Sequence, residues 1–182
     1  MRSEPRFFLQ VWGMPTYHNP GMGQPITPIT FGSDGITLSV DGETLDSRVV
    51  SGRYLYSVPT ALLRSQDPTS ELLSSGAVKT LTQKGVSDGP ESDSNDITSA
   101  SSSETNSIVT FNLVNGTVQT FVRDLRLNWT DTMSVTTDGH LYFMKNQLHN
   151  APSQQGGVGK RVKPYKPYRV PLPNGGKEIM LK

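Results

Sequence analysis

The stretch DGITLSVDG at residues 34–42 is a short β-type run between two Asp-Gly turns. Residues 131–139 read DTMSVTTDG, so a first Asp is again followed seven residues later by Asp-Gly. Another copy, the second of three in chain order, begins at Asp88-Gly89 and reaches Asn95-Asp96 at the same offset. The copies start at residues 34, 88 and 131, which are 54 and 43 residues apart. Because a period of about 40–50 residues in a β-rich chain is typical of one propeller blade, the repeat predicts a β-propeller; coincidence among turn residues is the alternative.

Similar short β-type runs recur along the chain, bounded by Gly, Asp-Gly or Asn-Gly, and they indicate an all-β fold. The 182 residues hold about three to four blades, whereas closed propellers have about four to eight. We therefore expect a partial β-propeller over residues 25–172. An irregular Pro/Gly-rich lead-in at 1–24 precedes it, and a C-terminal tail at 173–182 follows it. An open ring of this kind is incomplete, or it closes by self-association through its open propeller edges.

Two segments have a poor strand pattern. Residues 44–47 and 96–100 carry polar side chains where apolar strand residues are expected, so we expect unfilled core positions there. The Ser-rich segment at 92–107 is typical of a loop or a poorly formed strand. Short helices are expected at 59–64 and 70–75.

Composition excludes several classes of protein. The net charge is +1, which argues against dedicated nucleic-acid or polybasic membrane binding. With no Cys, disulfides, Cys-ligated zinc and thiol catalysis are absent. No apolar run approaches the roughly 18–20 residues of a membrane span. The apolar patch at residues 7–9 is too short for a signal peptide, so a cytoplasmic location is expected if the chain is translated as given.

The most specific motifs are YLYSVPTALLR at residues 54–64 and LNWTDTMSV at 127–135. Further stretches lie at 25–36, 85–89, 104–108, 138–143 and 146–148. Together they resemble the major royal jelly protein/yellow family in its fungal form, over nearly all of residues 20–172. The resemblance implies that this chain is the C-terminal half of a six-bladed propeller. Members of the family are usually secreted, so their location is extracellular. The chain would then be a truncated copy.

Asp34, Asp88 and Asp131 stand at the same place in the three copies. Equivalent strand starts of a propeller crowd towards the central channel, so these carboxylates could bind a divalent cation such as Ca²⁺. The resemblance extends to a lactonase group in which channel carboxylates and Asn hold such a metal. The alternative is that each Asp caps the turn into its strand by accepting bonds from backbone N–H groups.

Thr132, Asn146 and Leu148 match, through the same resemblance, positions that line the ligand pocket of amine-binding relatives. Thr and Asn exchange hydrogen bonds with an amine or hydroxyl, and an apolar neighbour packs against its ring. Leu148 replaces an aromatic residue of those binders, so stacking would be lost. The plainer interpretation makes Thr132 a strand hydroxyl and Asn146 a turn residue.

Two sequences match the acceptor pattern for N-linked glycans. Asn115 begins Asn-Gly-Thr and Asn128 begins Asn-Trp-Thr. Asn115 is expected at a hairpin tip, where a glycan has room. Both are glycosylation sites only if the chain is secreted, and are otherwise turn residues.

The resemblance to the royal jelly/yellow family favours a small-molecule-binding scaffold with no demonstrable catalytic set and an unidentified ligand. The alternative is an enzyme, either a metal-dependent lactonase or a tautomerase-like propeller that uses the channel Asp residues. A partial chain with no stable activity of its own is a third possibility.

Overall fold

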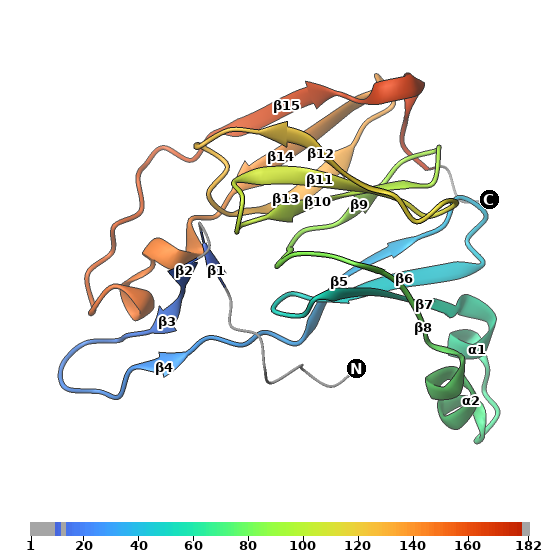
Figure 1. Cartoon of the computed structure of the whole chain (residues 1–182), viewed down its shortest axis with the longest axis horizontal. Coiled ribbons are helices and arrows are strands. Elements are labelled where there is room, and N and C mark those ends of the chain that lie inside the picture. The colour runs from blue at the N-terminus through green and yellow to red at the C-terminus, as the bar shows by residue number, and fades with distance from the viewer. Residues whose placement is uncertain (1–9, 12–13, 180–182) are drawn as a thin grey trace.

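A computed structural model describes residues 10, 11 and 14–179, which form antiparallel sheets with a few short helices (Figure 1). The first sheet has four strands in chain order: β5 (Ser33–Leu38), β6 (Thr44–Val49), β7 (Tyr54–Pro59) and β8 (Lys79–Gln83). The second also has four: β9 (Glu91–Ser92), β10 (Ile97–Ser102), β11 (Ser107–Asn112) and β12 (Val118–Arg123). The third has β13 (Thr130–Val135), β14 (His140–Lys145) and β15 (Pro167–Pro171).

Shorter elements connect and flank the sheets. Two small hairpins precede the first sheet: β1 (Gln10–Val11) with β2 (Met14–Pro15), and β3 (Tyr17–His18) with β4 (Thr27–Pro28). Between β7 and β8 lie the helices α1 (Thr60–Arg64) and α2 (Ser70–Ala77). Single 3₁₀ turns follow β14 and β15: η1 (Leu148–Asn150), η2 (Pro152–Gln154) and η3 (Pro173–Gly175). Within the described residues, no helix has the length and apolar character needed to cross a membrane. The patch at 7–9 lies outside the described residues.

The three sheets meet through their first strands. Strand β9 contacts both β5 and β13, and β10 also contacts β13. Figure 1 shows the first sheet beneath the second and third. This arrangement is consistent with a partial β-propeller, and no closed barrel is found in the described part of the chain. The all-β prediction is confirmed, while the number of blades stays a prediction.

The sequence repeat corresponds to three equivalent hairpins, β5–β6, β9–β10 and β13–β14. Each hairpin turns at a residue with a positive φ: Gly42 at 74°, Asp96 at 54° and Gly139 at 79°. Glycine adopts this region freely and Asp tolerates it, so Asn-Asp can replace Asp-Gly in the second copy. The regular spacing along the sequence is therefore the spacing of these turns.

The expectation of unfilled core positions at 44–47 and 96–100 is wrong. Residues 44–47 lie in β6 and residues 97–100 in β10. Most of their polar side chains are buried, and Asp46 is only 2% exposed. Small hydroxyls fill the interior and pair with each other, as Ser92 Oγ and Thr98 Oγ1 do at 2.8 Å. Because Ser and Thr satisfy each other here, the Ser-rich segment forms strand β10 instead of a loop.

Apolar clusters lie where the sheets meet. Leu55 of the first sheet packs with Ala100 and Phe111 of the second. Ile108 of the second sheet lies in a larger cluster with residues of the third: Met133, Val135, Leu141 and Phe143. A third cluster joins Val50, Val86 and Trp129. It uses residues that stand just before or after strands, so it fixes the position of the strand starts.

Candidate functional site

The strand starts of the three sheets lie against one another in the order of the repeat. Asp34 and Asp131 lie in β5 and β13, while Asp88 stands three residues before β9. A Cβ atom on Gly89 would overlap the backbone oxygen of Asp131. Only glycine allows this approach, so the Asp-Gly of the second copy brings Asp88 next to Asp131.

Each of two carboxylates has defined partners. Asp88 Oδ2 accepts a hydrogen bond of 2.9 Å from Trp129 Nε1, and its Oδ1 accepts one of 3.0 Å from Gly89 N. The second bond is the turn-capping contact that was the alternative to metal binding. Asp131 Oδ2 accepts from Asn146 Nδ2 at 3.1 Å. These bonds hold both carboxylates in fixed orientations.

The pKa of Asp88 depends on its burial and on the charges of the two other aspartates. Burial is the main cause that raises the pKa of Asp88, and the hydrogen bond from Trp129 opposes it. The nearby charges of Asp131 and then Asp34 raise the pKa further. A raised pKa makes a carboxylate a better proton acceptor, which suits it to acid–base catalysis.

The structure brings together two of the three predicted pocket residues. Asn146 Oδ1 accepts a hydrogen bond of 2.8 Å from Leu148 N, and Leu148 packs against the cluster that contains Trp129. His149 stacks on Trp129 with ring centroids 6.0 Å apart. Thr132 is exposed on β13. Binding of an amine by Thr132, Asn146 and Leu148 stays a prediction.

A metal site is not formed by these residues as they stand. Among residues 10, 11 and 14–179, no three His, Asp or Glu side chains lie close enough together to hold a metal ion. Asp34, Asp88 and Asp131 offer the oxygen donors that Ca²⁺ prefers, yet the Oδ2 atoms of Asp88 and Asp131 already accept hydrogen bonds. A divalent cation therefore stays a prediction for this chain.

The two glycosylation candidates differ in exposure. Asn115 is exposed between β11 and β12, in a hairpin that Gly116 closes with a φ of 71°. Its Oδ1 accepts a hydrogen bond of 3.0 Å from Thr117 N. Asn128 is half-buried, and its Oδ1 is buried without a partner in the described part of the chain. Only Asn115 has the exposure that a glycan requires.

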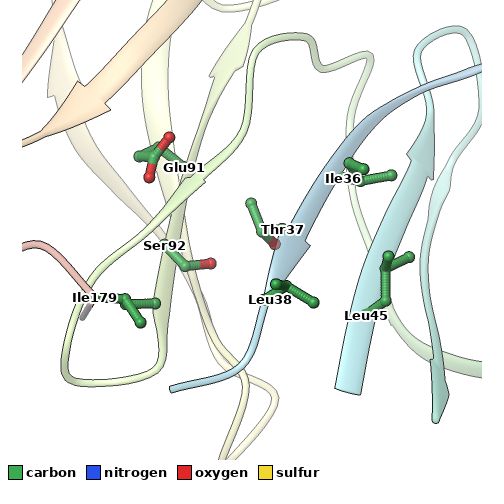
Figure 2. A pocket seen from close by; sticks show the side chains of 7 residues that line it. All are labelled: Ile36, Thr37, Leu38, Leu45, Glu91, Ser92 and Ile179. Carbon is green, nitrogen blue, oxygen red and sulfur yellow. The ribbon is translucent and has the colours of Figure 1, made fainter. Parts of the chain in front are cut away.

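Sequence reasoning missed a cavity of about 350 Å³ beside β5 and β9 (Figure 2). Figure 2 shows the side chains that line it: Ile36, Thr37, Leu38, Leu45, Glu91, Ser92 and Ile179. They come from the first two copies of the repeat and from the tail. No local pattern unites residues so far apart, which is why the sequence gives no signal for the cavity.

Comparison with solved structures finds propellers of the gluconolactonase and regucalcin type. A gluconolactonase from Xanthomonas campestris matches with a TM-score of 0.56 and 18% identity, covering 96% of this chain and 58% of that one. A calcium-binding protein, regucalcin, from Agrobacterium tumefaciens matches with a TM-score of 0.54 and 11% identity, covering 95% and 56%. A putative gluconolactonase matches with a TM-score of 0.51 and 12% identity, covering 96% and 55%. The chain thus spans just over half the length of these proteins, and at such identities they establish the fold alone.

No protein-family profile and no curated protein sequence matches the chain. The assignment to the major royal jelly/yellow family is wrong, because the structural neighbours are gluconolactonase and regucalcin propellers. The expectation of a secreted family depended on that assignment and is therefore withdrawn as well. The motif at 54–64 misled because it encodes strand β7 and helix α1, which are local elements of the fold. Such a motif does not distinguish between propeller families.

Proposed function

We propose that this chain is a lactonase-type propeller protein, which opens a small cyclic ester with water. The observation that carries the proposal is the close approach of the Asp88-Gly89 segment to Asp131, which leaves Asp88 half-buried beside a second carboxylate with its pKa raised. The likeness in fold to gluconolactonases supports this choice over a non-catalytic binding scaffold.

The reaction requires one side chain that accepts and returns a proton, and other side chains that keep that group correctly oriented. Asp88 takes a proton from water as the water oxygen attacks the lactone carbonyl carbon. The ring C–O bond then breaks, and the proton returns from Asp88 to the leaving alkoxide oxygen, so the product is an open hydroxy acid. Trp129 orients the Asp88 carboxylate through its N–H, and Asn146 orients Asp131.

The proposal does not assign Ca²⁺ to this chain, and the assay tests whether Ca²⁺ affects activity. Calcium binding is a property of the regucalcin neighbour, and the described residues of this chain do not form a metal site. No step of the proposed reaction depends on it. Activity is therefore to be measured both with added Ca²⁺ and after treatment with a chelator.

The test is hydrolysis of a lactone panel by the purified 182-residue chain, followed by release of acid at constant pH. Asp88→Asn keeps the shape of the side chain and removes the proton acceptor, so kcat should fall by about 100-fold or more. Asp67→Asn is the matched control, because Asp67 is exposed in the loop between α1 and α2. Equal rates for the Asp88→Asn variant and the parent, or no hydrolysis above buffer, would overturn the proposal.

A further inference from the structure

The cavity in Figure 2 begins close to the aspartates. Ile36 stands two residues after Asp34 on β5, and Glu91 stands three residues after Asp88. At about 3.3 Å per extended residue, the cavity starts about 7 Å along β5 from Asp34. A molecule held at the aspartates can therefore extend into the cavity.

The lining of the cavity is mainly aliphatic. Its apolar side chains are Ile36, Leu38, Leu45 and Ile179. Of its two hydroxyls, Ser92 Oγ is already paired with Thr98. The other, Thr37 Oγ1, is buried and has no hydrogen-bond partner among the described residues. One available hydroxyl cannot satisfy a polyhydroxylated ligand, whose buried hydroxyls each require partners.

The charged group at the cavity is a carboxylate. Glu91 is half-buried, and burial raises its pKa, with the charge of Glu178 raising it further. A further anion placed beside these two acids would be repelled. The cavity is therefore suited to an uncharged apolar group.

We infer that the substrate is an uncharged lactone carrying an alkyl substituent, with its ring at the aspartates and its chain in this cavity. The inference rests on the proposed function and adds the substrate class to it. A sugar lactone, which carries a hydroxyl on most ring carbons, fits the lining poorly. Each buried methylene stabilises the complex enough to change affinity about fourfold, so a four-carbon chain should raise kcat/KM on the order of 100-fold.

The experiment measures kcat/KM for γ-butyrolactone, for γ-lactones with alkyl chains of one to six carbons, and for δ-gluconolactone. We expect kcat/KM to rise with chain length, mainly through a lower KM, and to exceed that for δ-gluconolactone. Ile36→Ser should reduce this dependence on chain length. Ile36 is 60% exposed, so the substitution has little cost in folding. Leu72→Ser is the control, since Leu72 is 78% exposed on α2 and its loss should leave the dependence intact.

The outcomes separate the inference from the proposed function. Preference for δ-gluconolactone, or no dependence on chain length, overturns the inference while lactonase activity stands. If no lactone is hydrolysed, the proposed function fails and the substrate class fails with it. Calorimetric titration with the matching alkyl lactams, which resist hydrolysis, then tests whether the cavity binds an apolar group. Affinity that rises with chain length and is lost in Ile36→Ser supports an apolar ligand site, and uniformly absent binding overturns it.

Discussion

Replacing Asp46 by Asn is expected to remove a pH-dependent loss of stability from the fold. Asp46 is buried on β6, and its Oδ2 has no hydrogen-bond partner in the described part of the chain. Burial raises its pKa from 3.8 to about 6, against the attraction of Arg48 two residues on. The folded state therefore keeps this proton over a range in which the unfolded chain has released it. The contribution of Asp46 to the free energy of unfolding therefore falls as pH rises from about 4 to 6, by about 3 kcal/mol at 1.36 kcal/mol per pKa unit.

The assay is urea unfolding of both proteins, followed by circular dichroism, at intervals from pH 4 to pH 7.5. The free energy of the Asp46→Asn variant should exceed that of the parent by an amount that grows by about 3 kcal/mol over this range. Attraction to Arg48 is already contained in the pKa, so it needs no separate correction. Asp67→Asn, which changes an exposed carboxylate, should show no such growth. A difference between Asp46→Asn and the parent that stays constant with pH would refute the reasoning.

Three other substitutions test the interior and the site. Lys84 is buried, and its Nζ donates to three backbone carbonyls at 2.8–3.1 Å. Because Lys84→Met leaves these carbonyls without a donor, the free energy of unfolding measured in urea should fall by roughly 3 kcal/mol. A loss below 1 kcal/mol contradicts this. Gly89→Ala places a Cβ on the backbone of Asp131 at a φ of 50°, so the melting temperature should fall by several degrees, whereas an unchanged value argues against the close approach. Trp129→Phe removes the N–H donor to Asp88 and should raise the pKa of that carboxyl further, measured by NMR titration; a lower pKa excludes the bond.

Local turn chemistry made the hairpins predictable. The seven-residue spacing from Asp34 to Asp41-Gly42 returns in the structure as a strand and its turn, because positive φ selects particular residues whatever surrounds them. Strand β10 was not predictable in the same way. Its Ser-rich sequence gives no apolar alternation. Hydroxyl pairs such as Ser92 with Thr98, and the packing of Ala100 in an apolar cluster, make it a buried strand. Those pairs depend on how the strands come together.

The candidate site was predictable in part for a similar reason. Equivalent positions of a repeat occupy equivalent places in a propeller, so the spacing predicts that the aspartates stand near one another, and the structure places the Asp88-Gly89 segment against Asp131. The bond from Trp129 to Asp88 joins residues 41 apart and has no sequence signal. Likewise, the cavity beside β5 uses Ile179 from the tail. Long-range packing decides such contacts, so only the structure reveals them.

The residue after each of the first two aspartates is a glycine that lies against the next sheet. At Gly35, a Cβ would lie 2.6 Å from a ring atom of Pro90, and at Gly89 it would meet the third sheet. Both glycines are required because the next sheet starts against them. The third copy has Thr132 at this place, and Thr132 is exposed, with no further sheet described beyond β13. Among the described residues, Thr132 meets no such close approach, so a side chain with a Cβ is accommodated there.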